Sequence, residues 1–541
     1  MFALYSLLVP ALRLVSLVSC TSYIGVKDPH FGTDVFTGIP FAKHQTRLQP
    51  PVPLSGDQGV VIATSPVSKR CLEVGPGASP ALGSEDCLTL DIVRPSNPPG
   101  RDTSGFDSVT ITTTVSNIHK TNLLPVYVFI HGGEFIKGDK SEYDGRNLVK
   151  TSVTLGHPII YVAMNYRLGF LGFPAGKEAQ SHNSTNLGLL DQRQALVWLQ
   201  QNVRYFGGDP KKVTIGGQGS GADSAAYHLL AYGAKYGGLF RGAILQSGSA
   251  TGSSPIPSPK YTDYQFHYNA ITSATGCDGA TADSWTCLQN APIDALVKAY
   301  SKIFSDTRLG SLAPVFSPVI DGKFFTDFPS VLTEQGKFAR LPLLLGTTKD
   351  EFSNSVPVDR GFGSDAAILG YLNSRFPYVS DSTLRWLLTY YPVFNFKNTG
   401  PPLSGSQWTR AIAMVNDLLS FCPTTEQGIQ VSRVADVYKY RWDSVLQSAP
   451  VRQWEGVPRG SDLHFVFPLG GDMAKQTPAD LALISAFQRG LISFVNSLDP
   501  RSIRAADADF DIIWSKINAD IDFVNHTVCS FVKAKNAEFM R

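Results

Sequence analysis

The segment best suited to chemistry is a glycine-rich turn, Gly217-Gln218-Gly219-Ser220-Gly221, which follows the short apolar run Val213-Thr214-Ile215. In the pattern G-x-S-x-G, the serine lies on a sharp strand-to-helix turn and acts as a nucleophile. Both flanking glycines are present here, but Gly219 occupies the serine position. Glycine has no side chain with which to form an acyl-enzyme. Because glycine tolerates a strained backbone, we expect the turn itself to form.

Ser220, the next residue, is an alternative nucleophile. A turn centred on Ser220 would need glycine at the positions of Gln218 and Ala222. We therefore expect the Ser220 hydroxyl to lie at the start of a helix, while its backbone N–H donates to an oxyanion. A dinucleotide-binding turn is disfavoured, because the next strand ends at Gln246 without the acidic residue that such a site requires.

The residues around this turn alternate between apolar runs and helical patterns. The predicted strands are at 126–130, 159–164, 213–215 and 243–245, and the predicted helices span 189–203 and the residues around Ala225 and Leu229. This order predicts βαβ units, and hence an α/β fold with a large, mostly parallel central sheet and helices on both faces. Residues 251–340 and 353–450 are expected to form loop and helical insertions.

Further motifs follow one another in a recognisable order between about residue 36 and residue 470. They are Phe36–Ala42, Ser84–Ile92, His131–Gly133, Asn165–Arg167, Asn186–Gln192, Phe206–Pro210 and Gly346–Phe352. Together they resemble type-B carboxylesterases, a family that includes cholinesterases and several fungal lipases. The resemblance implies the α/β-hydrolase fold, with a single catalytic domain over residues 21–541.

The resemblance also assigns the other two members of a catalytic triad. The family's histidine lies in a G-x-x-H-G-x-D stretch, and Arg459 occupies its position in the matching segment Gly456–Asp462. Arginine stays protonated and cannot act as a general base. Glu351 matches the family's acid, and beside Arg459 it should form a bidentate ion pair. The alternative is a purely structural glutamate on a loop.

The oxyanion loop is the remaining part of the site that the resemblance implies. Gly132, Gly133 and the backbone N–H of Ser220 are the expected donors to an oxyanion. Glu134 stands where the family usually has a third glycine. Its backbone N–H remains, but its negative charge opposes the stabilisation of an anion.

No histidine in the sequence is an obvious replacement for the missing base. His464 lies five residues beyond Arg459, in the strand-like run Leu463–Phe467, and is expected to pack against its neighbours. His228 lies nine residues beyond Gly219 on the following helix, which is out of reach. Removing the serine or the histidine of a triad costs about six orders of magnitude in rate, so we expect very weak ester hydrolysis.

Cysteine usage and the N-terminus indicate export. Residues 1–20 are mostly apolar and are predicted to be a signal peptide, although Arg13 interrupts the run. The alternative is a buried or disordered N-terminal segment. The spacing of the six cysteines beyond Cys20 favours disulfides Cys71–Cys87 and Cys277–Cys287, and by elimination Cys422–Cys529. Asn183 and Asn525 begin N-x-[ST] triplets and are predicted glycosylation sites.

The composition limits the kinds of partner. The formal net charge is +2 without a long basic run, which argues against nucleic acid or an anionic membrane surface. Beyond the N-terminal segment, no stretch is long and apolar enough for a membrane span. No zinc, phosphate-loop or calcium-loop motif is present, so we expect neither a metal nor a cofactor. A small organic molecule is the expected partner.

Three functions remain open from the sequence. The first is a non-hydrolytic catalyst, in which Arg459 and the backbone donors stabilise a carboxylate or an enolate. The second is a binding or interaction protein on an inactive esterase scaffold. The third is an ester hydrolase that uses Ser220 or a substrate-assisted route. An open, polar pocket over Gly219 would favour the catalyst, whereas a filled pocket with a large exposed apolar patch would favour the interaction protein.

Overall fold

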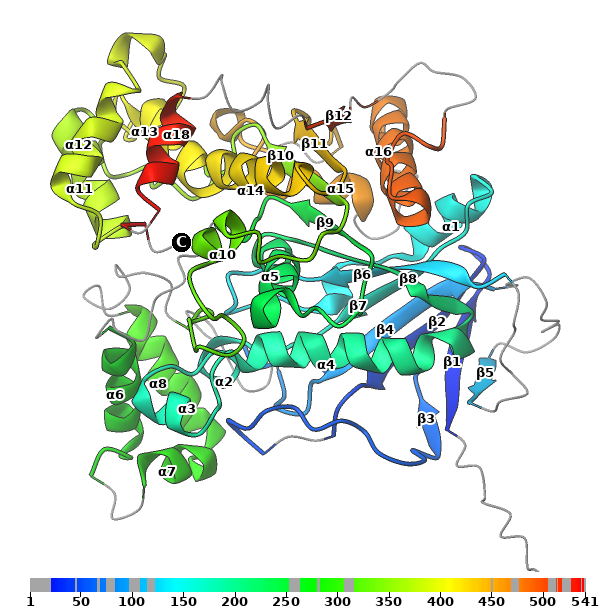
Figure 1. The fold of residues 1–541 in the computed structure, drawn as a ribbon. Helices are drawn as coiled ribbons and strands as arrows, with labels where there is room; N and C mark the ends of the chain where they lie inside the picture. The colour runs from blue at the N-terminus through cyan, green and yellow to red at the C-terminus, as the bar shows by residue number, and fades with distance from the viewer. Residues whose placement is uncertain are drawn as a thin grey trace, which may run out of the picture.

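The central feature of the structure is a 12-stranded sheet with the strand order β12-β11-β10-β9-β8-β6-β7-β4-β2-β1-β3, in which β5 pairs with β1 (Figure 1). The computed structural model describes residues 21–43, 46–65, 69–73, 83–96, 108–113, 122–252, 263–279, 283–305, 316–448, 451–468, 476–504, 512, 514–517, 527–536 and 538–539. The predicted signal peptide, residues 1–20, and Asn525 lie outside the described residues.

Neighbouring strands from β7 to β11 run parallel, as predicted. The bounds of these strands are β6 Leu124–Ile130, β7 Ile160–Met164, β8 Gly208–Gln218, β9 Gly242–Gln246, β10 Leu343–Thr348 and β11 Val437–Trp442. The remaining strands are β1 Ser22–Asp28, β2 Thr33–Pro40, β3 Val60–Ile62, β4 Thr89–Pro95, β5 Ser108–Thr112 and β12 Ser515–Lys516. All four strands predicted from apolar runs are present. The segment 353–450 is not wholly an insertion, because it contains β11, which pairs with β10.

Helices cover both faces of the sheet, and the alternation of side chains along β6 shows why. Val126 and Val128 belong to the core under α4 (Leu187–Asn202) and α5 (Ser220–Ala234). Tyr127 and Phe129 belong to the opposite core, under α1 (Arg146–Thr154) and α16 (Pro478–Ser497). Successive residues of a strand point to opposite faces, so a strand that is apolar throughout is buried on both sides.

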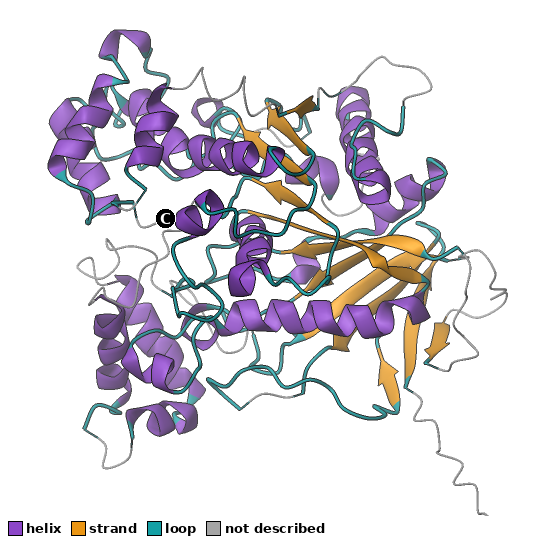
Figure 2. Cartoon of the chain, viewed as in Figure 1, coloured by secondary structure: helices purple, strands orange, loops and turns teal. Residues whose placement is uncertain are grey.

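Two groups of helices extend beyond the carboxyl ends of the parallel strands (Figure 2). One contains α6 Asp263–Thr275, α7 Ser284–Asn290 and α8 Ile293–Ser305. The other contains α11 Asp365–Arg375, α12 Asp381–Thr389, α13 Trp408–Asn416, α14 Cys422–Ser432 and α18 Thr527–Ala534, which share a separate apolar core. Shorter helices are α2 Gly169–Gly172, α3 Lys177–Ser181, α10 Pro329–Glu334 and α15 Leu463–Val466. Except for α18, which lies near the C-terminus, the helices of these two groups fall within the predicted insertions 251–340 and 353–450.

The three predicted disulfides are confirmed: Cys71–Cys87, Cys277–Cys287 and Cys422–Cys529. The third joins α14 to α18, which are separated by about a fifth of the chain. Within the described residues, no helix is both long enough and apolar enough to cross a membrane.

Candidate active site

The turn between β8 and α5 is a sharp strand-to-helix turn with Gly219 at its centre. Gly219 has φ +59° and ψ −126°, and its N–H donates to the carbonyl of Gln246 at 3.0 Å. A Cβ atom on Gly217 or Gly221 would collide with the carbonyl oxygen of Ile130. The flanking glycines therefore allow strand and helix to pack closely, and the turn forms as predicted.

Arg459 lies directly beside Gly219. A Cβ atom built on Gly219 would lie 3.6 Å from Nη2 and 3.7 Å from Nε of Arg459, which are ordinary contact distances. The guanidinium therefore occupies the space next to the point where a nucleophile would begin. A small side chain at position 219 would fit beside it.

Arg459 forms the predicted ion pair with Glu351, through one hydrogen bond between their side chains. Its Nη1 lies 3.3 Å from Oε2 of Glu351, whereas the sequence predicts a bidentate pair. The other oxygen, Oε1, accepts the backbone N–H of Thr348 at 2.8 Å. The exposed fractions of the Arg459 and Glu351 side chains are 16% and 2%. Burial raises the pKa of Glu351, and the nearby guanidinium opposes this shift only in part.

Two loops are joined so that this pair is held in place. The carboxylate of Asp350 accepts the N–H of Val457 at 2.9 Å, and the Asp350 N–H donates to the Val457 carbonyl at 3.0 Å. Gly456 has φ +60°, and a Cβ atom there would collide with the Asp350 carboxylate. The Arg459 N–H also donates to the carbonyl of Glu351 at 3.2 Å. The position of the guanidinium over Gly219 therefore depends on backbone pairing as well as on charge.

Asp462 anchors the other end of the Arg459 loop. Its carboxylate is fully buried and accepts hydrogen bonds from Gln246 Nε2 at 2.9 Å and from the Tyr440 hydroxyl at 2.7 Å. Burial raises the pKa of this carboxyl group. The loop is thereby tied to β9 and β11. The sequence pattern includes Asp462 but does not reveal these partners.

The oxyanion loop follows β6 and lies against the elbow. A Cβ atom on Gly132 would lie 2.6 Å from the carbonyl oxygen of Gln218, so the two segments are in close contact. Gly133 has φ +112°. Glu134 and Phe135 also have positive φ angles, +59° and +63°, which are unfavourable for residues other than glycine.

The Ser220 hydroxyl holds this loop. Its Oγ accepts the backbone N–H of Phe135 at 3.3 Å, so the side chain is directed toward the loop. No histidine lies among the described residues that line the cavity beside it. The hydroxyl therefore has the helix-terminal placement that the sequence predicts, without a partner to activate it there.

A cavity of about 560 Å³ opens over Gly219 and is lined by Glu134, Ser220 and Arg459, among other residues. Its charged lining residues in the described part of the chain are Glu134, Lys137, Arg375 and Arg459. Gln218, Asn354 and Ser355 add neutral polar groups, and Phe352 and Leu463 add apolar surface. The lining thus has three cationic side chains and a single carboxylate. The cavity is open and polar, and it is large enough for a small organic ligand.

His464, His228 and His131 lie near the site or on the elements that form it. His464 is half-buried on the short helix α15, so the predicted strand at Leu463–Phe467 is wrong, and burial lowers its pKa. His228 is buried and contacts Gln192 Oε1 at 3.1 Å, and burial lowers its pKa to about 3. His131 is buried under the oxyanion loop, and burial lowers its pKa to about 4. None of the three lines the cavity.

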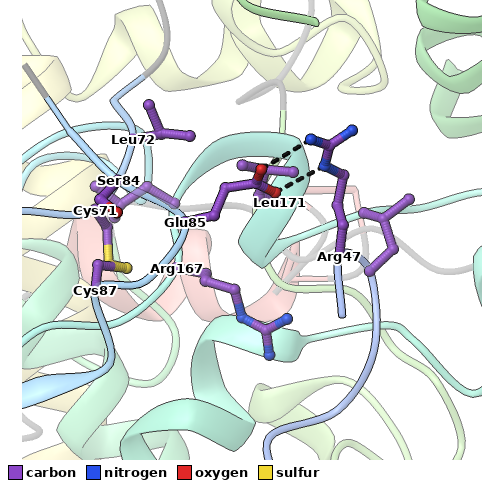
Figure 3. A pocket seen from close by; sticks show the side chains of 10 residues that line it. Arg47, Cys71, Leu72, Ser84, Glu85, Cys87, Arg167 and Leu171 are labelled. Atoms are coloured by element: carbon purple, nitrogen blue, oxygen red, sulfur yellow. Dashed lines mark hydrogen bonds and ion pairs between the residues drawn. A yellow bond between two sulfur atoms is a disulfide. The ribbon is translucent and has the colours of Figure 1, made fainter. Parts of the chain in front are cut away.

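A second, much smaller cavity lies beside the Cys71–Cys87 disulfide (Figure 3). Its volume is about 10 Å³, roughly the space of one water molecule. The guanidinium of Arg47 makes a bidentate ion pair with Glu85 at 2.7 and 2.8 Å and also donates to the carbonyls of Leu288 and Ala291. This arrangement joins the disulfide loop to α7, and a structural role accounts for it.

Asn183, one of the two predicted glycosylation sites, is exposed next to α3 with φ +55°. Its side-chain oxygen accepts a hydrogen bond from the Lys323 ammonium group. Glycosylation at Asn183 and Asn525 stays a prediction.

Comparisons with known proteins agree with this geometry. The model of the carboxylesterase family matches residues 22–536. A secreted triacylglycerol lipase of Gibberella zeae is 33% identical over 396 residues, which cover 68% of this chain but only 63% of the relative. Secreted lipase 1 of Botryotinia fuckeliana is 32% identical over 517 residues, covering 87% of this chain and 82% of that protein.

A solved structure extends the likeness to three dimensions. The crystal structure of Aspergillus niger EstA superposes with a TM-score of 0.79 at 26% identity, covering 96% of this chain and 97% of the other. The chain therefore belongs to the carboxylesterase family and has its α/β-hydrolase fold, as the motifs predict.

Proposed function

We propose that this protein is a non-hydrolytic member of its family, which binds a small organic carboxylate in the cavity over Gly219 and acts on it as a catalyst. The observation that carries the proposal is the position of the Arg459 guanidinium, 3.6 Å from where a Cβ atom of residue 219 would lie. In the family this site normally performs nucleophilic attack. In this protein the Arg459 guanidinium, a permanent cation, lies there instead. Guanidinium groups match the planar geometry of carboxylates.

The lack of a nucleophile and of a base argues against ester hydrolysis. Gly219 cannot form an acyl-enzyme, and Arg459 cannot accept a proton. The Ser220 hydroxyl is engaged with the Phe135 N–H, and no described histidine borders the cavity. A hydrolase that uses Ser220 is therefore the weaker hypothesis. We expect no labelling by a fluorophosphonate, and turnover of p-nitrophenyl butyrate no faster than that of Ser220→Ala.

The electrostatics of the cavity favour an anionic ligand. Lys137, Arg375 and Arg459 outnumber the single lining carboxylate, Glu134. The cavity also meets the N-terminus of the 15-residue helix α5 at Ser220, where backbone N–H groups and the helix dipole favour negative charge. A carboxylate, or an enolate that forms during the reaction, would be stabilised by the same groups.

Matched pairs of acid and methyl ester test the proposal. We expect butyrate and 2-oxobutanoate to bind at least about 10-fold more tightly than their methyl esters, measured by calorimetry or by ligand-observed NMR, since one charge-assisted hydrogen bond contributes about 1.5–3 kcal/mol. Arg459→Gln with Glu351→Gln should remove the preference without leaving a buried charge unpaired. Equal binding of acid and ester, or a preference that survives the double change, would contradict the proposal.

A second function, an interaction protein on an inactive scaffold, has one observation in its favour. Five apolar side chains on and after α12 are exposed, among them Trp386 at 64%, Phe394 at 88% and Leu403 at 76%. If they form one contiguous apolar patch, that patch would be typical of a contact surface. The open cavity over Gly219 favours the catalytic hypothesis over the interaction protein, for which a filled pocket is expected. An interaction protein would retain partner binding in Arg459→Gln and lose it in Trp386→Ser with Phe394→Ser.

We also infer that the protein is exported. Two similar proteins are named as secreted lipases, and three disulfides are typical of an oxidising compartment. Mass spectrometry of secreted material should find an N-terminus near residue 20 or 21. An unprocessed N-terminus on secreted protein would contradict the predicted signal peptide.

A further inference from the structure

We propose that Glu134 is the general base of this site, and that the reaction is proton abstraction from the carbon next to a carbonyl group. This inference rests on the proposed function, because it requires a small carboxylate in the cavity over Gly219. It adds the proton acceptor and the reaction class. The evidence is the position of Glu134, the strain of its backbone and the lack of a competing base among the described residues that line the cavity.

The position of Glu134 is fixed by its neighbours. The N–H of the peptide bond between Glu134 and Phe135 donates to Ser220 Oγ at 3.3 Å, and Ser220 directly follows Gly219. The Arg459 guanidinium lies beside Gly219. Glu134 and Arg459 both line the same 560 Å³ cavity, and Glu134 is exposed in it. A ligand whose carboxylate binds Arg459 would therefore occupy the same cavity that Glu134 lines.

The backbone of Glu134 is strained for a residue that carries a side chain. Its φ angle is +59°, in the left-handed region that favours glycine, and Phe135 follows with φ +63°. The resemblance to carboxylesterases places a glycine at position 134, which would avoid the strain. Backbone strain beside a candidate site motivates a functional hypothesis, and a carboxylate that lines a cavity with three cations provides one.

Other groups around the cavity are poorly suited to the role. Glu134 is the single carboxylate among the described lining residues, and histidine and cysteine are not among them. Tyr371 also lines the cavity, but burial raises its pKa and disfavours the phenolate. Lys137, Arg375 and Arg459 are cations that stabilise negative charge rather than accept a proton.

The proposed step balances without a cofactor. An oxygen of the Glu134 carboxylate takes the proton from the carbon next to the carbonyl. The electron pair of the broken C–H bond forms the carbon–carbon double bond, and the carbonyl π pair moves to oxygen. The enolate oxygen is then stabilised by Arg459 and by backbone N–H groups at the start of α5. Return of the proton from Glu134 to carbon regenerates the carboxylate. In D₂O the protonated Glu134 exchanges its proton with solvent, so the returned hydrogen is deuterium and the substrate becomes labelled.

Solvent deuterium exchange tests this step with 2-oxobutanoate, which has a carboxylate for Arg459 and acidic C3 protons beside a ketone. We expect the wild-type protein to accelerate exchange at C3, followed by NMR, with a saturable dependence on the concentration of 2-oxobutanoate. Glu134→Gln should lower the rate by about 100-fold or more, as expected for loss of a general base, and leave the Kd within a few-fold. Glu134→Asp should retain part of the activity.

Glu142→Gln is the matched control, because Glu142 lies in the same connection after β6 but pairs with Arg70 and does not line the cavity. It should exchange at the wild-type rate. If 2-oxobutanoate binds and exchange is equal in wild type and Glu134→Gln, or is not accelerated at all, the base assignment is overturned while the proposed function stands. If neither 2-oxobutanoate nor butyrate binds, the proposed function fails and this inference fails with it.

Discussion

A Cβ atom on Gly219 would lie 3.6 Å from Nη2 of Arg459, so the two positions that carry nucleophile and base in the family are adjacent here as well. Neither a glycine nor an arginine can perform those two roles. Glu351, which the motifs match to the third position, contacts Arg459 at 3.3 Å.

Rebuilding the triad is the most direct test of this view. We expect Gly219→Ser combined with Arg459→His to turn over p-nitrophenyl butyrate at least about 100-fold faster than either single variant, because a triad acts as a unit. A serine side chain at position 219 would lie at ordinary contact distances from Arg459. The positive φ at this position costs about 1–3 kcal/mol for a residue other than glycine. If the double variant folds and gains no activity, the oxyanion loop, including Glu134, has also diverged.

The buried acid predicts a pH dependence of stability. Burial raises the pKa of Glu351 above its ordinary value of 4.5, so above pH 4.5 the folded state binds more protons than the unfolded state. The free energy of unfolding therefore falls as the pH rises through the folded pKa. Glu351→Gln should flatten this fall in urea unfolding series run from pH 4.5 upward. A slope unchanged from wild type would show that Glu351 is ionised throughout.

The strain at residue 134 predicts that a smaller side chain stabilises the fold. Glycine adopts the observed φ of +59° without a steric penalty, so Glu134→Gly should raise the free energy of unfolding by about 1 kcal/mol. Chemical denaturation of wild type and Glu134→Gly at one pH measures the difference. A loss of stability would mean that the Glu134 side chain contributes more to packing than its exposure indicates.

The disulfides should contribute unequally to stability. Cys422 and Cys529 are 107 residues apart, whereas Cys277 and Cys287 are separated by 10. A longer closed loop restricts the unfolded chain more, by about 4.7 kcal/mol for 100 residues against about 3 kcal/mol for 15. Paired Cys→Ser changes should therefore destabilise the protein more at Cys422–Cys529. Equal losses at the two bridges, in urea unfolding, would contradict the loop-length argument.

The sequence by itself was enough to predict the fold class and the family. Apolar runs such as Val126–Ile130 are buried on both faces of a parallel sheet, and local spacing was enough to predict them. The type of residue at positions 219 and 459 also needs no structure, since glycine lacks a nucleophile and arginine lacks a free acceptor. The motif around Glu351 likewise located the carboxylate.

Only the tertiary structure decided how these residues meet. The short run Leu463–Phe467 has a strand-like composition, yet it forms helix α15 because the Arg459 loop is tied through Asp462 to β9 and β11. The side chains of Arg459 and Glu351 share one hydrogen bond, and the Thr348 N–H donates to the second carboxylate oxygen. The positive φ of Glu134 and the open cavity beside it depend on contacts between segments far apart in the chain. Local sequence patterns do not specify contacts between distant segments, so these features could not be predicted from the sequence.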